Sequence, residues 1–583
     1  MRFSGGTLVP MAPGMLRRLA SRLAVSAAAA AAASALAAVP AGAGTSTVFT
    51  LTGHGWGHGI GLSQYGALGY AQHGWAYDAI VKHYFQGARL RRLGSGIQER
   101  VQLASGRRTI SFGDASRLRV VDEGGTTKRR LPAGSYRIQP GPTGSHLRVI
   151  DLGTGRAVVK RLAGPVRLKP GSRPLRVDST VGIGWAHDHW HGFLRVIRTG
   201  SSLELVNLAP LEYYLRGVVP SEMPASWLRP ALRAQAVAAR SYAVATRHPS
   251  SAFDAYADTR SQVYGPIEHE ASASTAAVTA TAHQVLWYHG AVAIGFFSSS
   301  SGGRTASEQA AWGTSSGEPY LVPVRDRYDA AGGLNPNHTW AAAAYTPGSL
   351  AAALGGAAYV GSVDLTIDGP SRRVTQAVFH TNSGGRTLTG AQAEVALGLR
   401  SNYFRIKQVS LGAHGSLVAG TRVRISGRVW PRPSGRVSLL RHSGPGAPWK
   451  VAVRRLALGR NGAFAVRLGP TANRVYRVRT PRGAVSPRRT VLVRPALALE
   501  RSSGSFRATM YPALRGETLA LQHRSASGWR TVDHAPVGRH GHARFARAAT
   551  SGSWRVSYPG DAHHPAARSA PLDVHVVLGP THR

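Results

Sequence analysis

The chain of 583 residues contains no cysteine and few acidic residues. The absence of cysteine excludes a disulfide framework, a thiol nucleophile and every thiolate metal site. Only 27 Asp and Glu oppose 71 Lys and Arg, which gives a formal net charge of +44. Such a charge predicts a polyanionic partner, namely nucleic acid, anionic lipid or an anionic extracellular polymer, and says nothing about the fold.

Long apolar runs are also scarce, and the clearest one stands near the N-terminus. Basic residues up to Arg22 precede a small and apolar run over 23–39, and Ala41-Gly42-Ala43 follows it. This pattern is typical of a secretory signal peptide over 1–43, with an uncleaved anchor as the alternative. We therefore expect a protein exported to the cell wall. Outside the cell, anionic wall polymers are better candidate partners than nucleic acid, and we expect no nucleic-acid partner.

The length predicts several domains, because single hydrophobic cores rarely grow much past roughly 250–300 residues. Composition and strand or helix signals divide the exported chain into five parts. These are a Gly- and His-rich block (44–94), a β-rich subdomain (95–205), an α+β core (206–406) and two all-β modules (407–495 and 496–583).

Local signals support this division. A helix is expected over 228–246, because Pro230 suits a first turn and helix-forming Ala residues follow it. A second helix is expected over 271–283. Strands are expected over 118–121, 136–138, 147–150, 203–206, 285–288, 292–297 and 374–379.

The last part of the chain repeats itself. Trp449, Gly462 and Tyr476 are echoed by Trp529, Gly541 and Trp554, at offsets of 80, 79 and 78 residues. This period predicts two immunoglobulin-like β-sandwich modules joined near Pro495. Such modules are usually spacers or wall-binding appendages, and no chemistry is apparent in them.

A second sequence repeat, a short motif, lies in the centre of the chain. Segments 297–305 and 379–387 both carry Ser-Gly-Gly-Arg-Thr after an apolar strand signal. Two such loops would place hydroxyl groups and one arginine each, Arg304 and Arg386, beside a cleft. The alternative is a repeated tight turn that needs glycines with positive φ.

Glu222 is the candidate acid-base residue. It lies between Pro220 and Pro224 just before the expected helix, in a loop that the two prolines would stiffen. Apolar neighbours, including Trp227, would raise the pKa of its carboxyl, as a general acid for glycosidic cleavage requires. The alternative is that Glu222 caps the helix or pairs with Arg229 or Arg233.

Several long motifs resemble one family, that of stage II sporulation protein D and the amidase enhancer LytB. They cover most of 46–406. The matching segments are 54–67, 211–227, 231–242, 259–265, 299–305, 312–313, 319–321 and 388–404. The resemblance implies a multidomain protein with an α+β SpoIID-like catalytic core carrying the β-rich insert, followed by the two all-β modules.

The resemblance also implies a function, a lytic transglycosylase that cleaves the MurNAc–GlcNAc bond of peptidoglycan glycan strands and leaves a 1,6-anhydro end. The glutamate matching Glu222 would be the single catalytic carboxyl. In that reaction one carboxyl serves as acid and then as base, whereas two-carboxylate hydrolases need a partner roughly 5–9.5 Å away. The alternative function is a non-catalytic wall-binding activator of a peptidoglycan amidase, which makes an amidase a candidate partner.

Further residues in the matching segments are candidates for binding sugar hydroxyl, N-acetyl or lactyl groups. For each, packing, a turn or a surface position is the alternative. They are Arg240, Gln262, Tyr264, Ser299, Ser300, Ser301, Arg304, His54, His58, Ser63 and Gln64.

No cofactor or metal is expected. Some family members hold zinc with Cys and His just before the Gln-Val-Tyr element, but here the positions 259–261 read Thr-Arg-Ser. His54 and His58 could bind a metal, donate to substrate or order their loop, and two histidines alone make an incomplete metal site. The triplet His187, His189 and His191 would share one face of a strand, but only Asp188 is a neighbouring carboxylate in sequence, which favours an exposed or sugar-stacking strand.

The order of the motifs departs from the family. In sporulation members the His-Gly-x-Gly-His-Gly block closes the domain, whereas here it opens the exported chain. We expect a permuted arrangement in which 48–64 returns in space to the segment near Ile406. It would then complete one site with Glu222, with His54 and His58 within about 20 Å of that carboxyl.

Overall fold

The structure is a computed structural model of the whole chain, and it describes residues 45–142, 146–178, 188–356, 359–413, 415–444, 446–481 and 483–576. The expected signal peptide over 1–43 lies outside the described residues. Within the described ranges, no helix has both the length and the apolar character needed to cross a membrane.

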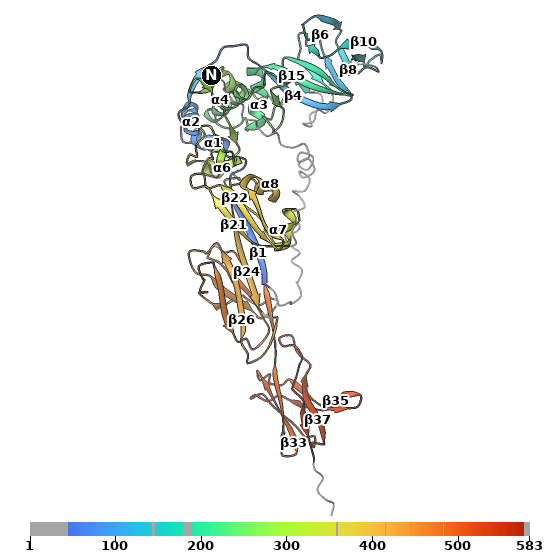
Figure 1. The fold of residues 1–583 in the computed structure, drawn as a ribbon, viewed down its shortest axis with the longest axis vertical. Coiled ribbons are helices and arrows are strands. Elements are labelled where there is room, and N and C mark those ends of the chain that lie inside the picture. Colours follow the sequence, from blue (N-terminus) through green and yellow to red (C-terminus); the bar gives the residue numbers. More distant parts are fainter. Residues whose placement is uncertain are drawn as a thin grey trace, which may run out of the picture. The chain divides into compact units, whose positions relative to one another are not determined.

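The chain forms two compact units. The core unit comprises Thr52–Ala341 and Val363–Arg405, and the tail unit comprises the described residues up to Leu51 together with Ala342–Ser362 and the chain from Ile406 onward. Figure 1 shows the helices of the core unit gathered together, with the strands of the β-rich subdomain beside them.

Helix α4 (Arg229–Ala245) lies among four other helices of the core unit, and its small Ala residues are buried on most sides. Small side chains let neighbouring elements approach closely, and α4 contacts helices α1, α2, α3 and α5. The other helices of the core unit are α1 Gln64–Gln72, α2 Tyr77–Tyr84, α3 Leu211–Glu222, α5 Ser272–Ala280, α6 Glu308–Trp312 and α8 Gly390–Leu397, with the 3-10 helices η3 Ile267–His269 and η4 Ala331–Gly333. Both helices expected from the sequence are confirmed as α4 and α5.

The β-rich subdomain consists of two sheets that share one hydrophobic core with the helices. Their strands pair antiparallel, except that the edge strand β16 pairs in parallel with β4. One sheet has the order β10-β9-β8-β5-β12-β13, and the other has the order β16-β4-β15-β14-β11-β6-β7. The bounds are β4 Gln98–Arg107, β5 Ile110–Asp114, β6 Leu118–Asp122, β7 Thr127–Leu131, β8 Gly134–Pro140, β9 His146–Asp151, β10 Ala157–Ala163, β11 Val166–Lys169, β12 Leu175–Val177, β13 Asp188–Trp190, β14 Phe193–Thr199, β15 Ser202–Pro210 and β16 Ala255–Tyr256. The four strands expected in this region are confirmed as β6, β8, β9 and β15.

Short strands complete the core unit. β3 Arg89–Arg92, β17 Gln284–Tyr288 and β18 Ala291–Val292 form one sheet, and β22 Val374–Thr381 pairs with β23 Gly384–Thr389 and with β21 Val360–Ile367. The expected strand over 292–297 is instead the end of β18 and the start of β19 (Phe297–Ser298). The two strands have different partners, because β18 pairs with β17 whereas β19 pairs with β2, and the Leu62 N–H donates to the Phe296 carbonyl just before β19.

The Gly-rich block is held against the loop that follows β19. Strand β2 (Leu62–Ser63) pairs in parallel with β19, and Trp56 and Ile60 bridge to Ser300 and Ala306. Strand β1 (Thr45–His54) is hydrogen-bonded to β24 (Phe404–Ala413), so the expected return of the block to the segment near Ile406 is present. This arrangement places Gln64, the first residue of α1, beside the end of α3.

The tail unit contains two all-β modules, each with its own hydrophobic core. The immunoglobulin-like topology stays a prediction. The remaining elements are β20 Thr339–Tyr345, α7 Pro347–Ala353, β25 Ser416–Val418, β26 Val423–Trp430, β27 Ser438–His442, β28 Lys450–Val453, β29 Ala463–Leu468, β30 Arg474–Arg479, β31 Arg489–Arg494, β32 Ala496–Ser502, β33 Ser505–Tyr511, β34 Thr518–Ser525, β35 Gly528–Pro536, β36 His542–Phe545, β37 Gly552–Tyr558, β38 Ala567–Arg568 and β39 Leu572–Val574.

The fit between the Gly-rich block and the loop after β19 gives a stability prediction. Gly302 has φ +70°, and a Cβ there would lie 2.5 Å from the Gly55 nitrogen. Gly74 has a similar φ of +80° with no atom within 4 Å of the added Cβ. In urea unfolding, we expect Gly74→Ala to cost about 1 kcal/mol of backbone strain, and Gly302→Ala about 3 kcal/mol because overlap adds to it. Equal costs would contradict the close packing of the block.

Candidate functional site

Glu222 is the last residue of α3, and Pro220 lies inside that helix. The expected stiff loop around Glu222 is therefore wrong. The helix ends at Glu222 because Met223 precedes Pro224, a position that disfavours helical conformation, and Met223 adopts an extended one with φ −136° and ψ 132°. The carboxyl is thus carried by a rigid element packed into the core.

The carboxyl of Glu222 is largely enclosed and accepts one backbone hydrogen bond. The Val263 N–H donates to Oε1 at 2.7 Å, and the Gln64 side-chain Nε2 donates to the Glu222 carbonyl at 3.0 Å. Burial raises the pKa of Glu222 above its ordinary value of 4.5, while the Val263 N–H and the Gln64 amide partly offset that rise. Within the described residues, Glu222 forms no salt bridge, so the alternative of pairing with Arg229 or Arg233 is not realised.

Aromatic side chains stand on the segments that adjoin Glu222. Tyr65 follows Gln64 in α1, and its ring lies 4.8 Å from that of Trp227, which is close to the start of α4. Tyr242 lies half-buried on α4, where burial raises the pKa of its hydroxyl and the Glu222 charge contributes in the same direction. Partly exposed rings beside a buried acid provide flat apolar surfaces against which sugar rings can lie.

Three of the predicted sugar-binding serines are buried and bind carboxylates instead. The Asp329 carboxylate accepts hydrogen bonds from Ser63 Oγ at 2.8 Å, from Ser300 Oγ at 2.9 Å and from the Ser301 N–H at 2.9 Å. Ser301 Oγ donates to Asp326 at 2.7 Å. Their hydroxyl groups already have partners inside the protein. Substrate binding by Ser63, Ser300 and Ser301 stays a prediction, and these contacts do not favour it.

The Asp329 network fixes the charge of its members. Burial would raise the pKa of Asp329, but hydrogen bonds from His338, Ser63 and Ser300 outweigh it and lower that pKa. The Asp329 carboxylate raises the pKa of His338, whose Nδ1 lies 2.8 Å away. Burial, together with the charge of Asp329, raises the pKa of Asp326. The Asp329 carboxylate therefore stays ionised, and it accepts hydrogen bonds from both the Gly-rich block and the loop after β19.

Ser299 and Arg304 are placed differently from their neighbours. Ser299 is half-buried, and its carbonyl accepts the Tyr65 N–H at 3.0 Å, so it lies next to the aromatic pair. Arg304 donates from Nη1 to the Pro370 carbonyl at 3.1 Å. In the sequence echo, Arg386 stands on the exposed hairpin of β22 and β23, so the two Ser-Gly-Gly-Arg-Thr segments have different structures.

His54 and His58 have separate neighbours. The His54 ring lies 4.8 Å from Tyr403, and burial and the charge of His338 lower its pKa. His58 accepts the Ile60 N–H at Nδ1 and lies 5.4 Å from Trp312. Burial and the charge of Arg373 lower the pKa of His58 to about 4, so both histidines are neutral at neutral pH. In the described part of the chain, no three His, Cys, Asp or Glu side chains gather as a metal site.

The side chains of Arg240, Gln262 and Tyr264 are buried in the core. Arg240 is fully buried and forms a bidentate ion pair with Glu212, with Nε to Oε1 at 2.9 Å and Nη2 to Oε2 at 2.7 Å. Gln262 accepts from Tyr214 and donates to the Ala239 carbonyl, and Tyr264 donates to Asn207. These contacts favour the packing alternative for the three residues, and substrate binding by them stays a prediction.

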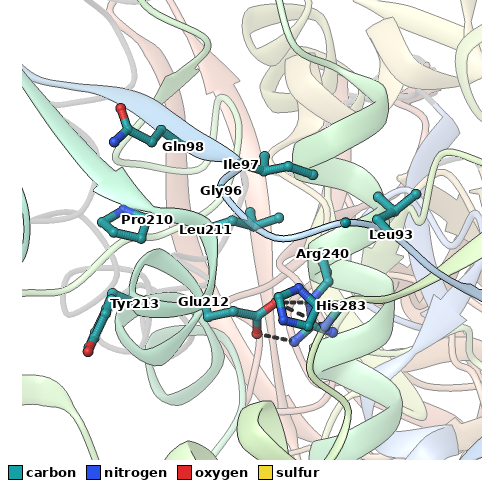
Figure 2. Close-up of a pocket in the computed structure, with 11 residues that line it drawn as sticks. Leu93, Gly96, Ile97, Gln98, Pro210, Leu211, Glu212, Tyr213, Arg240 and His283 are labelled. Atoms are coloured by element: carbon teal, nitrogen blue, oxygen red, sulfur yellow. Dashed lines mark hydrogen bonds and ion pairs between the residues drawn. The ribbon is translucent and has the colours of Figure 1, made fainter.

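The Glu212–Arg240 pair borders a cavity of about 260 Å³ that Figure 2 shows. The walls are mainly apolar, and the ring of His283, which has φ +64°, stands beside Glu212. Glu212 is the second residue of α3 and Glu222 the last, so the two carboxyls are about 15 Å apart along a helix that rises 1.5 Å per residue. The cavity is therefore separate from the Glu222 site.

The histidines around Trp190 are paired with carboxylates. His189 Nδ1 lies 2.5 Å from Glu268, and His191 Nε2 lies 2.6 Å from Glu270. The expectation that only Asp188 stands near them is wrong, because η3 brings distant acids to strand β13. His187 lies outside the described residues.

The Glu212–Arg240 pair gives a second prediction. Glu212→Gln leaves the buried guanidinium of Arg240 uncompensated and should lower the free energy of unfolding by about 3 kcal/mol. The matched change Glu268→Gln removes the exposed partner of His189 and should cost less than about 1 kcal/mol in the same urea titration. A small cost at both positions would show that Arg240 is free to serve another role.

Comparisons with known proteins find a family model and several relatives that this chain resembles. A family model described as Stage II sporulation protein matches residues 199–288. The chain is 42% identical over 115 residues to the amidase enhancer of Bacillus subtilis (strain 168), which is 20% of this chain and 15% of that protein. It is 32% identical over 231 residues to stage II sporulation protein D of the same organism, which is 36% of this chain and 64% of that protein.

The chain therefore spans less than two thirds of the length of either relative. Among solved structures, a two-domain fibronectin type III segment of chicken tenascin aligns at 13% identity. That alignment covers 28% of this chain and 97% of the tenascin segment, with a TM-score of 0.19. A similarity this weak carries no argument about the tail modules.

Proposed function

The chain is a SpoIID/LytB family protein, and we propose that it remodels peptidoglycan as a lytic transglycosylase that uses Glu222 as its single catalytic carboxyl. The observation that carries this proposal is the setting of Glu222. A half-buried carboxyl with a raised pKa, held by one backbone N–H at the end of a helix, is biased toward the protonated form that a general acid needs.

The reaction follows from one carboxyl with two oxygens. Oε1 accepts the Val263 N–H, so the proton of the neutral acid resides on Oε2. The Oε2–H protonates the glycosidic oxygen while the bond from that oxygen to C1 breaks. The C6 hydroxyl of the same muramyl residue then attacks C1, and its proton passes to the Glu222 carboxylate. The products are a 1,6-anhydro end and a free hydroxyl on the leaving sugar, and the acid is regenerated.

A lone carboxyl suits this chemistry better than hydrolysis. Two-carboxylate glycosidases hold a second carboxylate roughly 5–9.5 Å from the first, either as nucleophile or to activate water. Burial, the Val263 N–H and the Gln64 amide account for the pKa shift of Glu222, with no charged side chain contributing in the described part of the chain. An internal C6 hydroxyl needs neither a second carboxylate nor an ordered water.

Replacing the Glu222 carboxyl by an amide tests the proposed catalytic role of this residue. Glu222→Gln keeps the shape of the side chain but cannot donate a proton, so release of anhydro-muramyl ends from peptidoglycan glycans should fall at least about 100-fold. Mass spectrometry of the products, with glycans that carry or lack stem peptides, measures this release. Glu268→Gln, a matched change on an exposed carboxylate, should leave the rate unchanged. Undiminished anhydro ends with Glu222→Gln would remove the catalytic role.

The raised pKa of Glu222 also predicts a pH dependence of stability. Below its ordinary pKa of 4.5, Glu222 is protonated in both the folded and the unfolded chain. As the pH rises past that value the unfolded chain ionises first, so stability is lost until the pH passes the folded pKa. Relative to the wild type, Glu222→Gln should therefore be more stable at about pH 8 than at about pH 4 in urea unfolding. A difference that does not change with pH would contradict the buried, neutral carboxyl.

A second candidate function is activation of a peptidoglycan amidase. The observation in its favour is the 42% identity to a relative named amidase enhancer, over a stretch of 115 residues. An activator would keep the sugar-binding groove and increase release of stem peptides by an added amidase without forming new glycan ends. That outcome, with no anhydro ends from the wild type, would favour the activator over the transglycosylase.

The proposed location is the cell wall, reached by export. The proposal rests on the signal-like N-terminal sequence and on the net charge of +44. Charge-driven retention on anionic wall polymers is screened by salt, so concentrated salt should extract the protein from intact walls.

A further inference from the structure

The positive charge of the chain is distributed unevenly between the two all-β modules. Residues 407–495 contain 19 Lys and Arg and no Asp or Glu. Residues 496–583 form a module of similar size with 11 Arg and 5 Asp and Glu. A composition bias that acts on the whole chain does not account for this contrast. The charged Lys, Arg, Asp and Glu side chains of the first module are therefore all positive. The second module, which has both signs of charge, serves as the control in the experiment below.

Part of this charge lines a hollow of about 500 Å³ in the first module. The hollow lies where β25 approaches the ends of β26 and β29. Its lining residues are Ser416, Leu417, Arg422, Val423, Arg424 and Arg467. We call these six residues the arginine hollow.

Two of the arginines in this hollow stand directly opposite each other. In the antiparallel register of β26 and β29, Arg424 pairs with Arg467, and Val423 pairs with Leu468. Like charges directly across a ladder destabilise a sheet. Arg422, one residue before β26, adds a third guanidinium to the same place.

Nothing in the fold of the module requires these guanidinium groups. Val423 and Ile425 contribute to the hydrophobic core of the module, whereas Arg422, Arg424 and Arg467 are exposed. None of the three arginines forms a salt bridge with any residue that the structure describes. Their mutual repulsion is therefore relieved neither by burial nor by an internal carboxylate, and an external anion would relieve it.

We propose that the arginine hollow binds the phosphodiester groups of an anionic wall polymer whose repeating unit carries no base. Guanidinium groups form paired, charge-assisted hydrogen bonds with phosphate oxygens, which favours phosphate as the ligand group. Proteins that bind single-stranded nucleic acid combine a basic groove with aromatic rings on which bases stack. None of the six lining residues is aromatic, so a polymer without bases suits the hollow better than nucleic acid.

This site is independent of Glu222. It would hold the protein on the wall by a polymer that the proposed reaction does not cleave. Loss of polymer binding would leave the release of anhydro ends from soluble glycan unchanged. The two proposals can therefore fail separately.

The test compares two triple variants of the full chain that lose the same charge. The site variant is Arg422→Gln, Arg424→Gln, Arg467→Gln, and the control variant is Arg515→Gln, Arg524→Gln, Arg530→Gln, three exposed arginines of the second module. The probe is a fluorescent poly(glycerol phosphate) oligomer, titrated at several salt concentrations. Deoxythymidylate and polyglutamate oligomers of equal charge serve as competitors.

We expect the site variant to bind the probe about tenfold more weakly. A plot of log affinity against log salt concentration falls less steeply when phosphate contacts are lost, so its slope should become less negative by about 2 for three lost contacts. The control variant should change affinity less than about twofold. The melting temperature of the site variant should be unchanged or higher, because a repulsive cross-strand pair is removed.

Equal weakening in both variants would overturn the proposal in favour of diffuse charge attraction. Tighter binding of the deoxythymidylate oligomer would overturn it in favour of a nucleic-acid surface, and equal competition by polyglutamate would remove the preference for phosphate.

Discussion

The buried carboxylate of Asp329 is the interaction on which the candidate site depends. It accepts hydrogen bonds from Ser63 in the Gly-rich block and from Ser300, Ser301 and Gly302 in the loop after β19. These two segments are more than 200 residues apart in sequence, and they are also joined by the short parallel pairing of β2 with β19 and by two backbone bridges. Leaving a buried carboxylate without its donors is costly, so the two segments are fixed together. Gln64 and Tyr65, which follow Ser63, are thereby positioned beside Glu222.

The pKa of Glu222 depends on a balance between burial and hydrogen bonding. A carboxyl at a helix end in water would ionise near its ordinary pKa, and burial beside Met223 and Trp227 opposes that ionisation. One backbone N–H limits the shift, so the group is biased toward the neutral form without losing its capacity to ionise. Both states are needed by a carboxyl that donates a proton and then takes one back. The Asp329 network has the opposite character, because its many donors keep that carboxylate charged.

The sequence was informative wherever one residue type or one period carries the signal. The Ala-rich helix α4 and four strands of the β-rich subdomain followed from composition and alternation. An isolated acid between two prolines singled out Glu222, whose role stays a proposal. The return of the Gly-rich block followed from motif order. The same reasoning could not separate sugar-binding serines from structural ones, because Ser300 and Ser301 have the residue type and spacing of both.

Other features left no signal in the sequence. The Val263 N–H that binds Glu222 is a backbone group that any residue would supply, and the partners of Arg240 and His189 come from segments that only the fold brings together. An Arg in an Ala-rich helix is as consistent with substrate binding as with a buried ion pair until its partner Glu212 is placed. Acid-free runs such as 407–495 are visible in sequence, but the face on which their arginines meet is set by strand register.

The central claim is that Gln64, Tyr65 and Trp227 form one glycan-binding site with Glu222. A crystal structure of the Glu222→Gln variant with a soluble glycan fragment tests it most directly. The account predicts a glycosidic oxygen within about 3 Å of the side chain at position 222, with a sugar ring against Tyr65 or Trp227. Glycan bound instead in the cavity beside Glu212, or only on the tail modules, would contradict it.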